Sequence, residues 1–360
     1  MKRGLAAVAL AVMVTHLLFQ AGLQEGLAAR FRDALEDGSL LSASLSLELG
    51  APAPAADTAA SEPPELTEKA VPVAAPEAEL PALPRFTAFP GPGDKEEKPP
   101  PEETEPGDIR TTTIAGGLKI TNDTGYEVDI AALLAEELTQ TLPADSPQIL
   151  IIHTHGTEAY ERDIGDDYEA SDSGRTQDKD YNVVRVGDEL AAALTARGLV
   201  VLHDRGIYDY PSYTGSYARS GAAIQSYLSE YPDLALVIDL HRDALGAGGV
   251  VYKTMAEGAG LATAQLMLLV GTGENGLEHP AWRENLKLAL AMQNAMAKRH
   301  PTLARPVALK PERYNQHLTT GSLILEVGSS GNTLTEALNA VRLFADAAAP
   351  VLLDLIEASS

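Results

Sequence analysis

A short apolar run that stops at two histidines constrains this chain more than any other feature. Residues 149–152, Ile-Leu-Ile-Ile, lead directly into His153, Thr154 and His155, and Glu158 follows three residues later. Such a run predicts a buried strand, and functional side chains often lie on the loop after a rigid strand. Histidine and carboxylate side chains are also donor types that zinc prefers. The segment therefore predicts a metal-binding loop at the end of a strand.

Strand and helix patterns alternate from about residue 111 onward. Alternation of this kind predicts an α/β fold with a mostly parallel sheet flanked by helices. In such sheets, functional residues gather at the carboxyl ends of the strands. The predicted strands are 118–120, 149–152, 199–203, 234–240, 250–254, 266–270 and 322–327, and the predicted helices are 129–142, 180–197, 219–228, 282–299 and 333–356.

Two further apolar strands also turn polar where they end. Residues 234–240 lead into His241, Arg242 and Asp243, and residues 322–325 lead into Glu326. A catalytic zinc ion commonly has three protein ligands and one open position for water, and a separate carboxylate moves the proton. We expect the ligands to be His155, Glu158 and His241, with Glu326 as the catalytic proton shuttle.

The predicted domains are an N-terminal membrane anchor (1–25), a disordered linker (26–110) and a catalytic domain (111–360). Lys2 and Arg3 precede a largely apolar run long enough to cross a bilayer; a cleaved signal peptide is the alternative. The positive charge at the start predicts a single-pass protein of the cell membrane with its catalytic domain outside the cytoplasm. The linker is rich in Pro, Ala and Glu, a composition that does not support a packed core.

The bulk composition excludes several classes of function. The net charge of −24 argues against nucleic-acid binding, which needs a basic surface. The chain has no cysteine, so a zinc ion would be held by His, Asp or Glu. The glycines at 271, 273 and 276 formally match a dinucleotide fingerprint, but no acidic residue follows at the spacing that holds a ribose.

Several motifs resemble one family in the same order along the chain. They are ILIIHTHGTEAY, YNVVRVGDEL, VIDLHRDA, GTGENGLEHPAWRENLKLAL and RYNQHLTTGSLILEVGSSGNTLTEAL. The sequence resembles the stage II sporulation protein P family of membrane-anchored peptidoglycan hydrolases. The resemblance implies cleavage of the N-acetylmuramoyl-L-alanine amide, with possible cleavage of stem-peptide cross-links, during sporulation engulfment. It also implies peptidoglycan as substrate and stage II sporulation protein D as a partner.

That family is similar in turn to zinc-dependent N-acetylmuramoyl-L-alanine amidases. His155-Gly156 and His241 match their two histidine motifs, and Glu326 to Asn332 match a Glu-x-Gly-x-x-x-Asn motif in spacing. The remaining ligand departs from the pattern. The amidase register places Asp178 where those enzymes have a glutamate, so Glu158 and Asp178 both stay open as the third ligand, with Glu158 preferred.

Two alternative roles stay open for each of several other polar residues. His153 is either a ligand or a partner of one, and Arg242 with Asp243 is either an ion pair or a substrate contact. His279 and His317 lie in polar loops, where substrate contact and simple solvation are both open. The alternative functions are a zinc carboxypeptidase-like peptidase, which uses similar donors, and a wall-binding scaffold without catalysis.

Overall fold

The computed structural model describes residues 108–356, except 115–116, 164–165, 167, 169, 172–173, 248–249 and 258–259. The predicted membrane anchor and nearly all of the predicted linker lie outside these residues. Within the described part, no helix is both long and apolar enough to cross a bilayer. The first strand begins at Asp108, slightly before the predicted domain start at 111.

A seven-stranded mixed sheet forms the centre of the fold, in the order β2-β9-β8-β10-β5-β3-β4. All neighbouring strands run parallel except β8 and β10, which are antiparallel. The predicted α/β fold with a mostly parallel sheet is therefore confirmed. The strands are β2 (Ile120–Asn122), β3 (Ile149–Ile152), β4 (Val201–His203), β5 (Leu236–Asp243), β8 (Leu266–Gly271), β9 (Val307–Lys310) and β10 (Gly321–Ser329).

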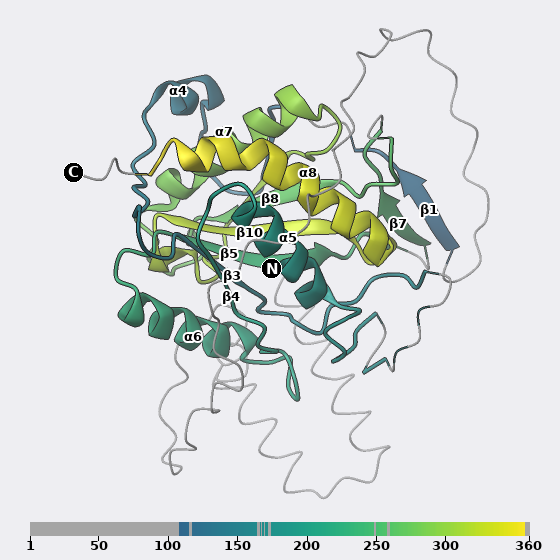
Figure 1. Ribbon diagram of the computed structural model, residues 1–360. Helices are drawn as coiled ribbons and strands as arrows, with labels where there is room; N and C mark the ends of the chain where they lie inside the picture. Colours follow the sequence, from purple (N-terminus) through teal and green to yellow (C-terminus); the bar gives the residue numbers. More distant parts are fainter. Residues whose placement is uncertain are drawn as a thin grey trace, which may run out of the picture. The chain divides into compact units, whose positions relative to one another are not determined.

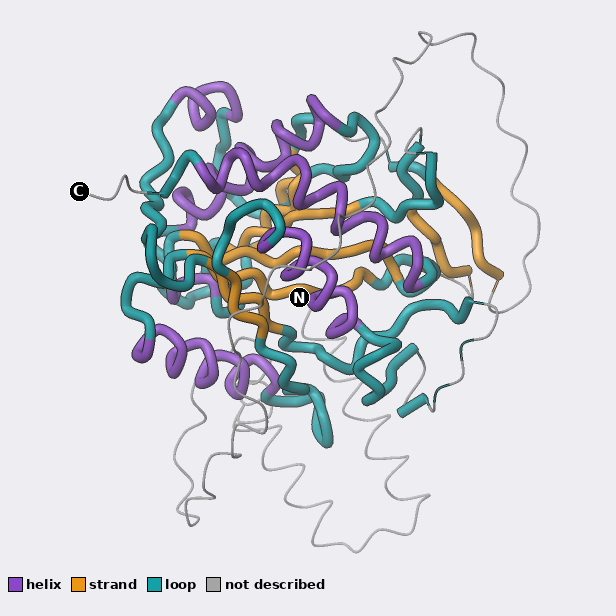
Figure 2. The backbone as a smooth tube through the Cα atoms, viewed as in Figure 1, coloured by secondary structure: helices purple, strands orange, loops and turns teal. Residues whose placement is uncertain are grey.

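Helices cover both faces of this sheet, as Figures 1 and 2 show. In β3, Ile149 and Ile151 join the larger core beneath α5, α7 and α8, whereas Leu150 and Ile152 join a second cluster with α6. This division follows from the alternation of side chains along a strand. The helices are α4 (Ile130–Ala135), α5 (Val183–Thr195), α6 (Ser216–Glu230), α7 (Trp282–Arg299), α8 (Leu334–Leu353) and the 3-10 helix η1 (Gln316–Leu318).

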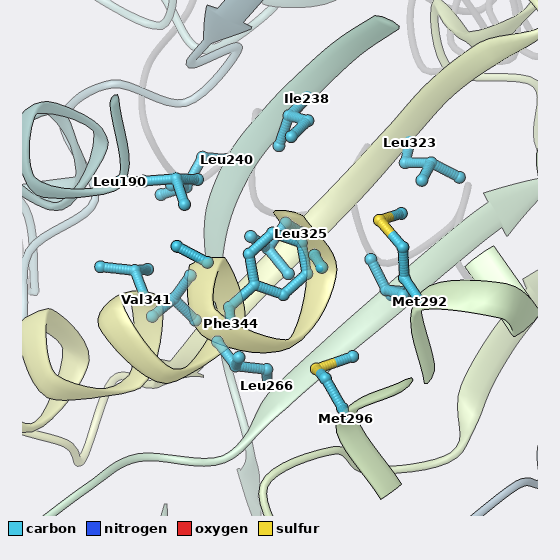
Figure 3. Packing of buried hydrophobic residues seen from close by; sticks show 14 of the residues in the cluster. Leu190, Ile238, Leu240, Leu266, Met292, Met296, Leu323, Leu325, Val341 and Phe344 are labelled. Atoms are coloured by element: carbon cyan, nitrogen blue, oxygen red, sulfur yellow. The ribbon is translucent and has the colours of Figure 1, made fainter. Parts of the chain in front are cut away.

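The larger core lies between α8 and the middle of the sheet. Phe344 of α8 is fully buried and lies beside Leu325 of β10, with Val341 and Leu240 close by (Figure 3). Removing an aromatic ring from such a site costs about 3–5 kcal/mol of stability. This packing fixes β5 and β10, the two strands that deliver His241 and Glu326.

Three strands form a separate small sheet in the order β1-β7-β6. They are β1 (Asp108–Thr112), β6 (Gly246–Ala247) and β7 (Val250–Thr254). Residues 250–254 form a strand as predicted, but outside the main sheet. The strands β1, β6 and β9 were not predicted, because they are short or lie beside residues with strong turn signals.

The predicted helix at 129–142 is wrong beyond its first turns. Asp129 caps α4 by accepting a hydrogen bond from the backbone of Ala132, but the backbone is extended at Glu136. Beyond it, Leu142 is buried and donates a backbone hydrogen bond to Leu355. This tertiary contact outweighs the local helical pattern.

Candidate active site

The three predicted strand ends lie side by side in the sheet. β5 lies between β3 and β10 and is parallel to both. Ile152 pairs with Asp239, and Glu326 pairs with His241. The loop after β3 therefore opens next to the polar end of β5, with Glu326 on its other side.

His155 is buried in this loop between aromatic rings. Only 6% of it is exposed, and its Nδ1 atom is buried without a hydrogen-bond partner. The Tyr213 ring stacks on it at 4.4 Å between centroids, and the His241 ring meets it edge-on at 5.2 Å. Burial, reinforced by the charge of His241, lowers the pKa of His155 to about 4. A neutral imidazole with a free nitrogen can bind a cation.

His241 lies between two carboxylates. Its Nε2 is 2.9 Å from Asp239 Oδ1, a close ion pair without hydrogen-bond geometry, and its Nδ1 is 3.5 Å from Glu158 Oε2. Burial opposes protonation, but both carboxylates outweigh it and raise the pKa of His241 well above its ordinary value. Asp239 also accepts hydrogen bonds from the backbone and hydroxyl of Thr154. Asp239 thus connects the β3 loop to the β5 end.

Glu158 is buried beside both histidines. Its Oε2 accepts a hydrogen bond from the backbone N–H of Arg242 at 3.1 Å, and its Oε1 lies 3.5 Å from the Arg175 guanidinium. Burial opposes ionisation, yet the hydrogen bond and charge of His241 lower the pKa of Glu158 to about 2. The Glu158 carboxylate is therefore ionised and lies beside His241.

Asp178, the alternative third ligand, lies elsewhere. Asp178 is exposed, and its carboxylate accepts a hydrogen bond from the backbone N–H of Asp180. Its own backbone N–H donates to the Thr176 hydroxyl. The structure thus brings Glu158, and not Asp178, together with the histidines.

His153 faces away from His155, with both ring nitrogens engaged. Nδ1 contacts the Leu240 carbonyl at 3.0 Å, and Nε2 contacts His203 Nε2 at 2.8 Å. His203 in turn contacts Asp188 of α5. Both imidazoles fit against the helix because Gly187 has no Cβ, which would collide with them. His153 supports the strand end from the other face of the sheet.

Glu326 lies partly buried at the end of β10, and its Oε2 is buried without a hydrogen-bond partner. Burial raises the pKa of Glu326 to about 8, against the opposing charge of His241; Glu158 and Asp243 add to the rise. A carboxyl with this pKa can hold a proton near neutral pH and release it again.

Arg242 and Asp243 do not pair through their side chains. The Arg242 guanidinium donates to the carbonyls of Ala159 and Gly174, which ties the β3 loop to β5. Asp243 instead forms an ion pair with the buried Arg305 at 2.7 Å. Sequence proximity suggested the wrong ion pair, because adjacent residues of a strand point to opposite faces.

Asn332 is fully buried and holds the loop after β10. Its side chain accepts hydrogen bonds from the backbones of Thr254 and Ser329, and donates to Thr254 and Glu336. Gly328 adopts φ +67°, a conformation that favours glycine. The Glu-x-Gly-x-x-x-Asn spacing thus builds a tight loop that joins the two sheets.

His279 and His317 lie at the other end of β10 from Glu326. His317 belongs to η1, which precedes the first residue of β10, and His279 lies in the loop before α7. His279 is only 4% exposed, so simple solvation does not describe it.

Asp209, Arg175 and Tyr213 also surround His155, and no sequence pattern predicted them. Asp209 accepts hydrogen bonds from the backbone and hydroxyl of Thr157 and from Arg175. Arg175 also lies over the Tyr213 ring. No motif marks these residues; only the fold brings the 204–215 loop onto the β3 loop.

Across the described ranges, no group of three or more His, Asp and Glu side chains has the spacing of a metal site. The donors that converge nevertheless suit zinc in kind, with two imidazoles and one ionised carboxylate. His155 Nδ1 is buried without a hydrogen-bond partner and lies 4.0 Å from Asp209 Oδ2, and the two carboxylates beside His241 raise its pKa and favour its protonated form. A bound cation could replace that proton, so His155, Glu158 and His241 fit a zinc ion.

A family model for Stage II sporulation protein P matches residues 92–349. The chain is 29% identical over 217 residues to the stage II sporulation protein P of Bacillus subtilis (strain 168). The match covers 56% of this chain and 50% of the relative, so the aligned part spans about half the length of that protein.

The fold also has similarities among solved structures. The N-acetylmuramyl-L-alanine amidase Ami1 from Mycobacterium smegmatis is 15% identical with a TM-score of 0.35, over 60% of this chain and 98% of that one. The CwlD amidase from Clostridioides difficile, solved in complex with the GerS lipoprotein, is 10% identical with a TM-score of 0.34. This match covers 57% of the present chain and 98% of that amidase.

Proposed function

Because the chain belongs to the stage II sporulation protein P family, we propose that it is a peptidoglycan hydrolase of sporulation. The proposed reaction is cleavage of the amide between N-acetylmuramic acid and L-alanine, with stem-peptide cross-links as a second substrate. The observation that supports it most is the convergence of His155, Glu158 and His241 beside Glu326. Three donor side chains from two strand ends and a proton-transfer group from a third suit hydrolysis of an amide.

In this proposal His155, Glu158 and His241 hold zinc. When bound, zinc supplies Lewis acidity that polarises the scissile carbonyl and lowers the pKa of water. Asp239 keeps His241 oriented, and Arg242 fixes Glu158 through its backbone N–H. Such supporting contacts commonly determine how tightly a metal site binds.

Glu326 moves the proton. Its buried Oε2 has no hydrogen-bond partner that would compete for a proton. Glu326 takes a proton from the attacking water and then donates it to the nitrogen of the leaving amine. A nearby cation would lower its pKa from about 8, which favours the base form at the start of the reaction.

The proposed setting is the outer side of the cell membrane during engulfment. The apolar segment at residues 1–25 would anchor the chain, and the Pro-rich linker would let the catalytic domain reach the wall. Stage II sporulation protein D is the proposed partner.

Mass spectrometry of muropeptides tests the proposed reaction. Purified peptidoglycan is incubated with the full-length protein, with Glu326→Gln, and with Glu274→Gln as a control in an exposed loop. An amidase releases intact stem peptides and leaves glycan strands without peptides, and Glu326→Gln alone abolishes this release. Loss of only terminal residues from stem peptides would favour a carboxypeptidase-like enzyme. Wall binding without any product would favour a scaffold.

A further inference from the structure

A second polar group lies outside the candidate active site. Arg313, His317 and His279 come together where the loop after β9 meets the loop after β8. Arg313 donates only to the backbone carbonyl of Glu278, at 3.3 Å, and forms no ion pair with any residue in the described ranges.

Four nitrogen atoms of this group are buried and have no hydrogen-bond partner in the described part of the chain. Arg313 Nε, His317 Nδ1 and both ring nitrogens of His279 are buried without hydrogen-bond partners. The carbonyls of Gly271 and Gln316 lie near His279 but lack hydrogen-bond geometry. Buried polar groups normally have partners, so a ligand that is not part of the chain could satisfy these nitrogens.

The backbone of the loops after β8 and β9 has an unusual conformation beside Arg313, His317 and His279. Tyr314, next to Arg313, has φ 53°, the only positive φ at a non-glycine position in the described part of the chain. A Cβ on Gly271 would collide with the carbonyl of Glu312, and one on Gly273 would collide with Leu277. Of the glycines that formally matched a dinucleotide fingerprint, Gly271 thus permits the close approach of these two loops, and Gly273 permits a tight turn within its own loop. Strained backbone of this kind often marks a functional segment.

The guanidinium of Arg313 gives this group one positive charge that can attract an anion. Burial, then the Arg313 charge, lowers the pKa of His317 to about 4; burial also lowers that of His279 to about 4. Both histidines are therefore neutral at pH 7 and can each donate one N–H, while the guanidinium supplies the charge. Arginine matches the planar geometry of a carboxylate.

A row of aromatic rings connects the group with the candidate active site. The Tyr314 ring lies 5.6 Å from the Tyr217 ring, which lies 5.5 Å from His155. Glu326 pairs with Met267, so Gly271 lies four residues along β8 from that pair and one strand across, a straight-line separation of about 14 Å from strand geometry. Four extended peptide residues span roughly this length.

We propose that Arg313, His317 and His279 form a carboxylate-binding subsite that holds an acidic peptide whose other end lies at Glu326. The identity of that peptide as the stem peptide rests on the proposed function, whereas the carboxylate site itself does not. Tyr314 and the apolar face of β8 and β10 would lie beneath the peptide between the two ends.

Calorimetric titration with two matched tripeptides tests this subsite. Full-length protein is first stripped of metal by a chelator, so that neither hydrolysis nor metal coordination contributes. The ligands are Ala-Glu-Ala with free carboxylates and Ala-Gln-Ala amide without them. We expect the acidic tripeptide to bind at least about tenfold more tightly. Equal affinity for the two tripeptides, or no binding of either, would overturn the proposal.

Variants locate the binding in the structure. Arg313→Gln should weaken the acidic tripeptide at least about tenfold, and His317→Gln by a smaller factor. Arg299→Gln is the control, because this exposed arginine pairs with Asp346 at the far end of α7. Unchanged affinity in both Arg313→Gln and His317→Gln would contradict the subsite. Peptidoglycan digestion by the metal-loaded wild type tests the proposed function separately. The carboxylate subsite and the proposed hydrolase function can therefore fail independently.

Discussion

Glu326 and His241 occupy paired positions on neighbouring parallel strands, β10 and β5. Since both strands are fixed by the core beneath α8, the separation of the two side chains is set by the sheet and not by a flexible loop. The pairing places a carboxyl with a raised pKa next to an imidazole with a raised pKa. Groups with shifted pKa values that lie together are typical of catalytic sites.

Glu326→Gln should remove most of the activity while the protein stays folded. The amide has nearly the shape of the carboxyl but cannot accept the water proton, and loss of such a group commonly costs 10²–10⁴-fold in rate, on the order of 3–5 kcal/mol. The measurement is release of stem peptides from purified peptidoglycan. Activity within about threefold of wild type, which is 0.7 kcal/mol, would exclude Glu326 as the proton shuttle.

Asp239→Asn should weaken zinc binding without removing a proposed ligand. Asp239 holds His241 and Thr154 in place, and loss of such a partner typically costs 10–100-fold in metal affinity. Competition with a chromophoric chelator measures the affinity. Asp233→Asn, at an exposed position, is the control. Equal zinc affinity in Asp239→Asn and the control would show that the carboxylate does not support a metal site.

The stability of metal-free protein should fall as the pH rises, because of Glu326. Its pKa is about 8 in the folded protein against an ordinary 4.5, so the folded state binds more protons between these values. The stabilising contribution is full below pH 4.5 and is lost as the pH rises through 8. Between pH 5 and pH 9, wild type should lose a few kcal/mol more than Glu326→Gln. Denaturant unfolding measures this; parallel pH profiles would contradict the assignment.

Asn332→Ala should act on stability and not on chemistry. The fully buried amide joins the end of β10 to β7 and α8. Its removal leaves backbone groups without partners, at a cost of about 1–3 kcal/mol. We expect a lower melting temperature, with product release per folded molecule retained at low temperature. Loss of activity without loss of stability would instead place Asn332 in the reaction.

The sequence predicted those elements whose patterns are strong and local. The strand 149–152 and the helix 282–299 have the predicted bounds, because apolar periodicity and burial agree there. The helix after Asp129 failed because Leu142 packs against the C-terminal segment, a contact that no local pattern reveals.

The candidate site was partly predictable for a similar reason. Parallel strands bring their carboxyl ends together, so the loop with His155 and Glu158 was expected near His241. The position of Asp239 was also predictable from the sequence, since it lies two residues before His241 on the same face of β5. The contacts of Asp209 and Arg175 depend on how distant loops fold over His155, and the sequence does not specify them.

The metal content of the full-length protein tests most directly whether the loop after β3 and the end of β5 form one zinc site. Protein loaded with zinc and dialysed against a mild chelator is measured by atomic absorption, for wild type, Glu158→Gln and Asp178→Asn. We predict one zinc per chain in wild type and Asp178→Asn, and loss of zinc in Glu158→Gln. Zinc retained in Glu158→Gln but lost in Asp178→Asn, or no zinc in wild type, would contradict the account.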